Sequence, residues 1–120
     1  MTVEEIAKGL VADCQKGDYE APYGKYYSPN IVSIESTPGD FHECVGLEAV
    51  AKKGEWWMTT FEVLDAEADG PWINGNQFAV KFEMKVKHRE SGQEMEIEEI
   101  ALYTVEDGKI VREVFFAEPQ

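Results

Sequence analysis

Glu99 lies on a face of a predicted strand that is otherwise free of acidic residues. Successive side chains of a strand point to opposite faces, so every second residue shares one face. The other members of this face are Met95, Ile97, Ala101, Tyr103 and Val105. A carboxyl group in an apolar cavity has a raised pKa, because burial penalises its charged form, and it can then exchange protons near neutral pH. We therefore select Glu99 as a candidate catalytic residue.

Glu113 is a second candidate, on the last predicted strand, which runs from Ile110 to Ala117. If Val111, Glu113 and Phe115 face inward, Glu113 shares a cavity with Glu99, and two carboxylates so placed cannot both ionise cheaply. The alternative for Glu99 is that it marks a bulge and belongs to the solvent-exposed face of its strand. The alternative for Glu113 is that it pairs with a lysine across strands. The sequence leaves both alternatives open.

Three extended segments between residues 76 and 118 position these acids. The first segment alternates apolar with mostly charged residues, the period expected of a strand with unlike faces. Its apolar side chains are Phe78, Val80, Phe82, Met84 and Val86. Ser91-Gly92 and Asp107-Gly108 supply turns between the segments, since glycine tolerates the left-handed backbone of tight hairpins. We therefore predict a meander of strands.

The upstream part of the chain predicts three helices and two further strands. Thr2 and Glu5 form a capping box, which favours a helix start at that point, and Gly17 favours its end. Another helix follows Gly46, and its apolar face, which must meet the sheet, consists of Leu47, Val50, Gly54, Trp57 and Phe61. Trp56 lies off that face and is a candidate for the rim of a cavity. The remaining expected segments are a helix over 18–26, strands over 31–36 and 61–68, a loop over 37–44 and a corner over 70–75.

This order of elements predicts a single α+β domain spanning residues 1–120, with three helices covering one face of a strongly curved, mostly antiparallel sheet. The opposite face is not cleanly polar. It carries Ile100 and Leu102, together with either Val111 and Phe115 or Ile110, Val114 and Phe116. Because no helix is left to cover these side chains, we expect a homodimer through the outer sheet face.

Composition narrows the classes of partner. With 24 acidic and 11 basic residues the formal net charge is -13, which repels phosphate backbones and anionic lipids, so we expect neither nucleic acid nor membrane as a partner. Cys14 and Cys44 lack the spacing of metal ligands, and His42 and His88 lie too far apart for a metal signature. We expect no metal and no cofactor. The start of the chain lacks the features of a signal peptide, which favours a cytoplasmic protein.

Several short motifs, taken in this order, resemble one known family. They are Gly17-Asp18 between the first two helices, Tyr27-Ser28-Pro29-Asn30 before a strand, Gly46-Leu47-Glu48-Ala49-Val50 opening the third helix, and Asp107-Gly108-Lys109-Ile110-Val111 before a closing strand with Phe115-Phe116. Together they resemble the SnoaL-like branch of the nuclear-transport-factor-2-like superfamily. The resemblance implies a cone-shaped, cystatin-like roll whose open end is an apolar pocket for a small molecule. The superfamily includes ketosteroid isomerase and polyketide cyclases, so fold alone does not settle function.

The resemblance also implies a third candidate acid. Glu35 matches the general base of ketosteroid isomerase, at the end of a strand after the tyrosine-led turn. The positions that match the hydrogen-bond donors of that enzyme are Leu10 and Ala101, which cannot donate, so steroid isomerisation by that mechanism is not expected. We expect the pocket to be lined by Tyr26, His42, Trp56, Trp57, Ala101, Tyr103 and Phe115.

Two functions follow as hypotheses. The first is a cofactor-free enzyme, an isomerase, cyclase, dehydratase or hydrolase, that uses Glu35 as base with Glu99 or Glu113 as partner on an apolar substrate. The second is a non-catalytic homodimer that binds a small ligand or a protein through the same cone. The sequence does not name the substrate.

Overall fold

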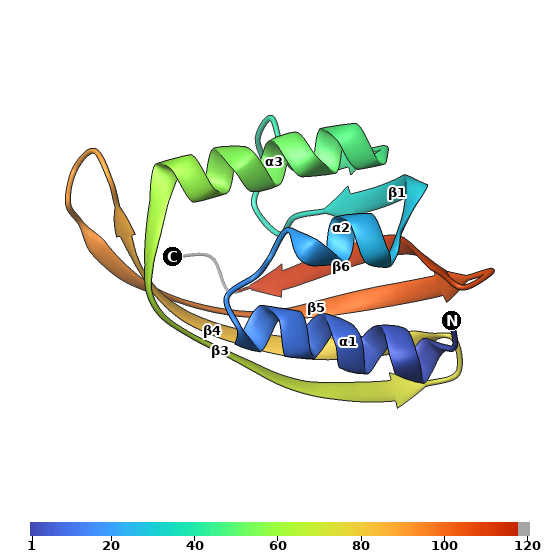
Figure 1. Ribbon diagram of the computed structural model, residues 1–120. Helices are drawn as coiled ribbons and strands as arrows, with labels where there is room; N and C mark the ends of the chain where they lie inside the picture. Colours follow the sequence, from blue (N-terminus) through green and yellow to red (C-terminus); the bar gives the residue numbers. More distant parts are fainter. Residues whose placement is uncertain (118–120) are drawn as a thin grey trace.

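Three helices lie on one side of a six-stranded sheet in the computed structural model, which describes residues 1–117 (Figure 1). The helices are α1 (Val3–Gln15), α2 (Ala21–Lys25) and α3 (Leu47–Thr60). The strands are β1 (Tyr27–Ile34), β2 (Glu43–Val45), β3 (Phe61–Asn74), β4 (Gln77–His88), β5 (Glu94–Glu106) and β6 (Lys109–Ala117). Within the described residues, no helix is long and apolar enough to cross a membrane.

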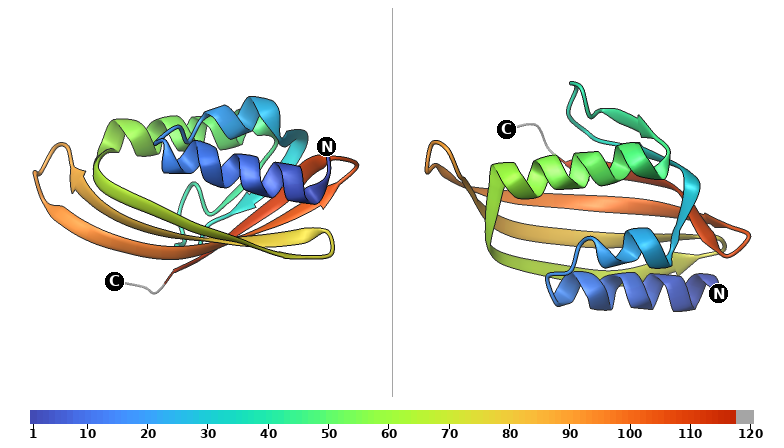
Figure 2. Two further views of the ribbon diagram at one scale, coloured as in Figure 1. Left: turned by 60° about the horizontal axis from the view of Figure 1, so that its bottom comes forward. Right: turned by 45° about the horizontal axis from the view of Figure 1, so that its top comes forward.

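The sheet has the strand order β2-β1-β6-β5-β4-β3 and is mixed. β1 runs parallel to β6, whereas every other neighbouring pair is antiparallel. The two turned views show that the sheet curves around the helices, which all lie on its concave side (Figure 2). The α+β class and the curved, mostly antiparallel sheet agree with the prediction. Only α1 and α2 precede the sheet in the chain, because α3 is inserted between β2 and β3.

The predicted bounds of three segments are wrong. β1 begins at Tyr27, before the expected start at Ile31. The last two residues of the expected loop, 43 and 44, belong to β2 (Glu43–Val45), which pairs with β1. The expected corner over 70–75 lies largely inside β3, which continues to Asn74. A register shift between Asp69 and Trp72 accommodates Pro71 there, and an edge strand tolerates proline because one side of its backbone has no partner strand.

The second helix begins at Ala21, whose amide donates to Asp18 Oδ1 at 3.0 Å.

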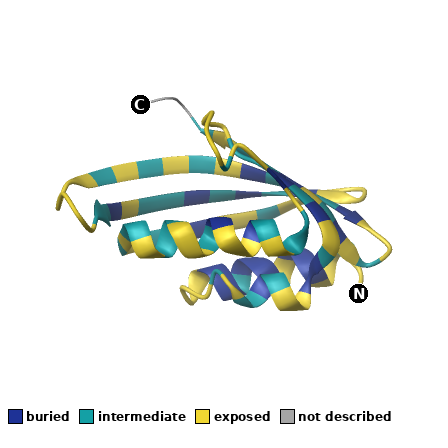
Figure 3. Ribbon diagram, turned by 90° about the horizontal axis from the view of Figure 1, so that it is seen from above, coloured by how far each residue is buried: buried dark blue, intermediate teal, exposed yellow. Residues whose placement is uncertain are grey.

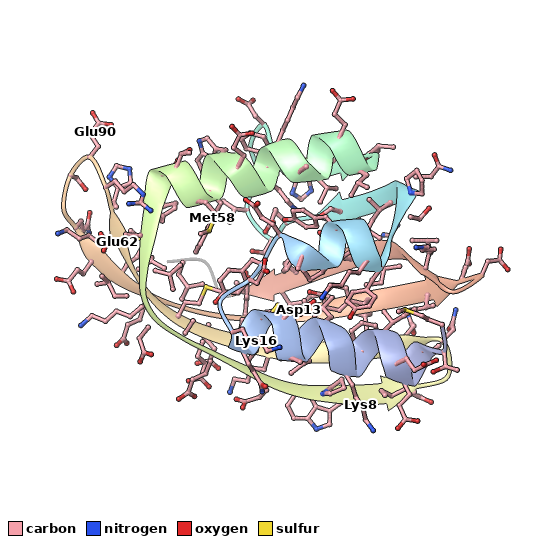
Figure 4. All side chains as sticks on the ribbon, viewed as in Figure 1. Lys8, Asp13, Lys16, Met58, Glu62 and Glu90 are labelled. Atoms are coloured by element: carbon pink, nitrogen blue, oxygen red, sulfur yellow. The ribbon has the colours of Figure 1, made fainter. Side chains whose placement is uncertain are left out.

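α1 covers one half of the sheet and is fixed at both ends. The predicted capping box is confirmed, since Glu5 donates its amide to Thr2 Oγ1 and its carboxylate accepts from the Thr2 amide. Near the other end, Asp13 accepts from Lys25 Nζ at 3.0 Å, which ties α1 to α2 (Figure 4 labels Asp13). The buried face of α1 contains Ile6, Ala7, Leu10, Val11 and Cys14.

A one-residue bulge in β6 decides which of its side chains face the helices. Val105 pairs with Ile110 and Thr104 pairs with Arg112, so Val111 is an extra residue opposite β5. Ile110 and Glu113 are consequently both buried although they are three positions apart. Beyond the bulge, Phe115 faces inward, whereas Phe116 on the outer face is 54% exposed.

The concave face is packed most completely at one end, although Val86 near the other end of β4 is also fully buried. At the end covered by α1, the side chains on β4, β5 and β6 are almost completely buried, namely Phe78, Val80, Tyr103, Val105 and Ile110. At the other end, Met84, Ile97 and Phe115 point inward but are only half-buried. This difference is visible along the strands in Figure 3. The half-packed end is therefore where the interior opens to solvent.

Two helical glycines provide a test of packing around α1. A Cβ atom at Gly9 would lie 2.1 Å from the Tyr26 hydroxyl oxygen, whereas one at Gly24 would meet nothing within 4 Å. We expect Gly9→Ala to lower the free energy of unfolding by about 1–3 kcal/mol, because the buried Tyr26 ring must move. Gly24→Ala, the matched control, should be neutral or stabilising by up to about 1 kcal/mol. Urea denaturation of both variants measures the difference, and equal effects would contradict this packing.

Candidate functional site

Residues from four adjacent strands form rows across the concave face. One row consists of Ser33 on β1, Glu113 on β6, Tyr103 on β5 and Phe78 on β4. The next row toward the open end contains Phe115, Ala101 and Val80, and the one after it contains Ala117, Glu99 and Phe82. The rows bring two of the predicted acids, Glu99 and Glu113, onto the same face of the sheet.

Glu113 is the buried acid of the site. Its side chain is 2% exposed and both carboxylate oxygens accept hydrogen bonds, one from the Tyr27 hydroxyl and one from Ser33 Oγ at 2.7 Å. Burial raises the pKa of Glu113, against the opposing effects of Lys53 and of these two hydrogen bonds. The alternative that Glu113 pairs with a lysine across strands is wrong, because the bulge at Val111 turns it inward and its oxygens accept from Tyr27 and Ser33.

Lys53 on α3 supplies the positive charge of the site. Its Nζ donates to Ser33 Oγ at 2.5 Å, forms an ion pair with Glu35 Oε1 at 2.8 Å, and lies 5.1 Å from the centre of the Phe115 ring. Lys53 was not among the site residues predicted from the sequence. A signal was present, since Lys53 follows Val50 by three residues and precedes Trp57 by four, inside the helix face that meets the sheet.

Glu35 follows β1 directly and is more accessible than the buried Glu113. Its side chain is 30% exposed, and its amide donates to the carbonyl of His42 at 2.7 Å. The ion pair places one carboxylate oxygen of Glu35 beside Lys53. The loop containing His42 thus holds Glu35 through the backbone, whereas the exposed His42 ring contacts the Thr37 carbonyl at 3.2 Å.

Glu99 differs from the other two acids because it has no partner. It points to the concave face and is half-buried, yet within residues 1–117 no hydrogen bond or ion pair involves its carboxyl group. Burial, followed by the charge of Glu35, raises the pKa of Glu99 to about 7, and Lys53 opposes this rise. Glu99 is therefore able to take up and release a proton near neutral pH.

A broad hollow lies mainly over the outer face of the sheet and also borders Glu99. It has a volume of about 960 Å³ and lies around the last residues of β6 and the adjoining part of β5. Eight of its twelve lining residues face outward, among them Glu83, Ile100 and Phe116, whereas the other four belong to the inward-facing set: Met84, Ile97, Glu99 and Ala117. The side chain of Met58 points from α3 toward the sheet (Figure 4).

Three tyrosines surround the buried carboxylate. Tyr27 donates to Glu113, whereas the hydroxyl groups of Tyr23 and Tyr103 have no hydrogen-bond partner within the described residues. Burial, followed by the charge of Glu113, raises the pKa of all three phenols. They therefore remain protonated and can serve as hydrogen-bond donors. Burial likewise raises the pKa of the nearby Cys14 thiol to about 12, so it is not a thiolate nucleophile at neutral pH.

The remaining expected pocket residues are spread more widely. Ala101 and Phe115 lie in the row between Glu113 and Glu99, and Trp57 is half-buried on α3. Trp56 is 45% exposed and packs on Phe41 with ring centres 5.2 Å apart. Tyr26 is buried, but its hydroxyl lies against Gly9 of α1 and away from the acids. Among residues 1–117, no group of three or more His, Cys, Asp or Glu side chains could hold a metal ion.

These features define a class of protein: a curved α+β domain whose concave face carries three carboxyl groups, one ammonium group and protonated phenols. The sequence profile of the SnoaL-like domain matches residues 1–117. The chain therefore belongs to the SnoaL-like family, which confirms the resemblance seen in the sequence.

Solved structures agree with this assignment. A candidate SnoaL-like polyketide cyclase from Mesorhizobium loti is 36% identical, with a TM-score of 0.92 over 97% of this chain and 99% of that one. A Xanthomonas campestris protein of unknown function with a cystatin-like fold is 26% identical, with a TM-score of 0.79 over 100% of this chain and 93% of that one.

A more distant structure shows the fold alone. A candidate isomerase from Bacillus subtilis is 16% identical, with a TM-score of 0.75 over 99% of this chain and 91% of that one. No curated protein matches the chain in sequence.

The environment of Glu99 gives opposite predictions for two substitutions. Glu35→Gln removes a negative charge that raises the pKa of Glu99, so that pKa should fall below 7, whereas Lys53→Met removes a positive charge that lowers it, so that pKa should rise above 7. Carboxyl-carbon NMR titration between pH 4 and pH 9 measures both shifts.

Lys81→Met is the matched control for loss of a lysine. Lys81 lies on the outer face, paired with Glu83 and Glu98, and its removal should leave the titration of Glu99 unchanged. If Glu99 titrates near 4.5 in the wild-type protein, or if both site variants shift its pKa in the same direction, the electrostatic description of this site is wrong.

Proposed function

We propose that this protein is a cofactor-free acid–base catalyst that moves a proton on a small, neutral carbonyl compound, with Glu99 as the proton-transferring residue. The observation that supports this proposal most directly is the isolation of Glu99. It is half-buried on an otherwise apolar face of β5, it has no partner among residues 1–117, and burial raises its pKa to about 7. A general base is most effective when its pKa lies near the working pH.

The charge of the site argues for a neutral substrate. Three carboxyl groups face one ammonium group, and the whole chain has a formal net charge of -13. An anionic substrate would be repelled both at a distance and within the site. An apolar compound can instead rest against Phe115, Met84 and Ile97, which point inward and are half-buried.

In this proposal the pKa of Glu99 is influenced by the charges of three neighbours, namely Lys53, Glu35 and Glu113. Lys53 contacts Glu35 and, through Ser33, reaches the buried Glu113. Because one oxygen of Glu35 is already engaged by Lys53, Glu99 is the acid best placed to meet a substrate. Proton abstraction next to a carbonyl is a step shared by isomerases and many cyclases, the activities by which the Bacillus subtilis and Mesorhizobium loti proteins are described.

Deuterium exchange tests the proposal without knowledge of the natural substrate. A panel of neutral ketones and lactones is incubated in D₂O with the wild-type protein, and loss of the α-proton signal is followed by NMR. We expect catalysed exchange of at least one compound and a reduction of roughly 100-fold or more in Glu99→Gln. Below pH 7 the rate should rise with pH as Glu99 loses its proton, and it should level off above pH 7.

His88→Gln is the matched control for an acid–base group outside the site. His88 lies in the β4–β5 hairpin, where its ring contacts Ser91 Oγ at 2.9 Å. Its replacement should leave exchange unchanged. If ligands bind but no compound exchanges, the second candidate, a non-catalytic ligand-binding domain, replaces the enzyme.

We also propose that the protein forms a homodimer through the outer sheet face. Ile100 and Phe116 are cross-strand neighbours on that face, 45% and 54% exposed, and Leu102 and Val114 form the adjacent pair. A second copy of the same face would cover this apolar patch with matching side chains. Acidic side chains surround the patch, among them Glu83, Glu96 and Glu98, so association should strengthen as salt screens their repulsion.

Light scattering coupled to size-exclusion chromatography tests the dimer. We expect the mass of a dimer for the wild-type protein and of a monomer for Ile100→Glu, because a charge would be buried at the centre of the interface. Val45→Glu is the matched control, since Val45 is 64% exposed on β2, away from the patch. A wild-type monomer at high salt and high protein concentration would rule the interface out.

A further inference from the structure

Arg112 is an arginine on the outer sheet face that pairs with no acid of its own chain. It is exposed on β6, and within residues 1–117 it forms no ion pair. On the same face, Lys81 and Lys85 of β4 are each paired with glutamates. The chain carries 24 acidic and 11 basic residues, so acids are in excess almost everywhere. An arginine left without a carboxylate is therefore available to a partner.

Arg112 belongs to a row of hydrogen-bond donors that crosses the outer face. The donor row consists of Asn74 on β3, Gln77 on β4, Thr104 on β5 and Arg112 on β6. Each of these side chains can donate a hydrogen bond, and none of them is acidic. The donor row forms one border of the apolar patch on this face.

The opposite border of the patch is acidic. The patch occupies the two middle rows, with Leu102 beside Val114 in one and Ile100 beside Phe116 in the other. The acidic row that follows consists of Glu67 on β3, Glu83 on β4 and Glu98 on β5. All three of these glutamates line the broad hollow. The patch thus has donors along one side and carboxylates along the other.

The symmetry of a dimer decides which borders meet. When two copies of one sheet face pack together, the two-fold axis lies in the plane between them. An axis parallel to the strands places every row on the same row of the partner, and so the acidic row on the acidic row. An axis perpendicular to the strands, centred on the patch, places the donor row of each copy on the acidic row of the other. Like charges that face each other across an interface destabilise it, so charge favours the perpendicular axis.

We propose that the protein forms a two-fold dimer in which the donor row of each copy lies on the acidic row of the other, with an ion pair between Arg112 and Glu98 of the partner subunit. This inference rests on the homodimer proposed above. It adds the relative orientation of the two copies and the residues that fix it. Because the axis repeats every contact, the ion pair occurs twice in the dimer.

The spacing of strands and sheets allows this pair. Neighbouring strands lie about 4.8 Å apart, and packed sheets lie about 10 Å apart. With the axis over the patch, Thr104 lies opposite Glu98 of the partner subunit, and Arg112 lies one strand to the side of Thr104. An arginine and a glutamate that extend toward each other can bridge such a separation. The planar guanidinium group can then donate two hydrogen bonds to one carboxylate.

The hollow is the place that would receive the arginine. It has a volume of about 960 Å³, and six of its twelve lining residues are acidic whereas only Lys85 is basic. A guanidinium group from a second copy would supply positive charge where carboxylates are in excess. The same contact would give Arg112 the acid that its own chain does not provide.

Exchange of the two charges tests the pairing. Arg112→Glu and Glu98→Arg each place like charges opposite one another, and each should weaken the dimer by roughly 10- to 100-fold. The double variant restores opposite charges, and its dissociation constant should return to within about 3-fold of the wild-type value. Sedimentation analysis of the full-length proteins at one fixed salt concentration measures the dissociation constants. Lys81 keeps Glu83 as a partner when Glu98 is replaced, so the outer face should remain folded.

Lys8→Glu is the matched control. Lys8 lies on α1, on the helical side of the sheet, where it pairs with Glu4 (Figure 4 labels Lys8). Its replacement changes the net charge by the same amount as Arg112→Glu, so it measures the general repulsion between copies. The proposal is overturned if Arg112→Glu weakens the dimer no more than Lys8→Glu, or if the double variant is as weak as the single variants.

Failure of this inference can be told apart from failure of the proposed dimer. If Ile100→Glu is a monomer while Arg112→Glu dimerises like the wild-type protein, the apolar interface stands and the proposed orientation falls. If the wild-type protein is a monomer at high salt and high protein concentration, the interface and the orientation both fall.

Discussion

The site depends on the imbalance between one ammonium group and three carboxyl groups inside a curved sheet. Lys53 contacts Glu35 directly and reaches Glu113 through Ser33. A single cation cannot neutralise three acids. Glu99 is the acid without a contact, and burial, followed by the charge of Glu35, raises its pKa to about 7. The pKa of Glu99 is thus set by its burial and by the charges of its neighbours. Lys53 is also nearly buried, so its loss would leave Glu113 without compensation in the interior.

The two ends of the concave face divide structural and chemical tasks. Under α1, side chains such as Phe78, Val80 and Ile110 are fully buried and hold the sheet in its curved form. Toward the other end, the same face is only half-covered and carries the titrating acid. Apolar burial at one end therefore compensates for the incompletely packed, charged region at the other. A domain of 120 residues contains both only because the strands are long enough to span both ends.

The features that follow from local pattern were predictable from the sequence. Alternation on β5 placed Glu99 on the concave face, and the capping box placed the start of α1. Glu113 was left open, because a bulge changes the facing of every residue beyond it and alternation alone does not reveal a bulge. Lys53 was missed because a lysine in an apolar helix face is usually assumed to reach solvent along its flexible stem. Its burial depends on Ser33, Glu35 and Phe115, which come from distant segments that meet only in the fold.

The extra residue in β6 has an evolutionary consequence. Because Val111 is unpaired, Ile110 can fill the core while Glu113, three positions later, also points inward. Loss of one residue at this point would restore simple alternation, and the strand would keep its hydrophobic anchor while turning its carboxyl group toward solvent. A single-codon insertion or deletion could therefore create or abolish the buried acid in one step, without substitution of any residue in the site.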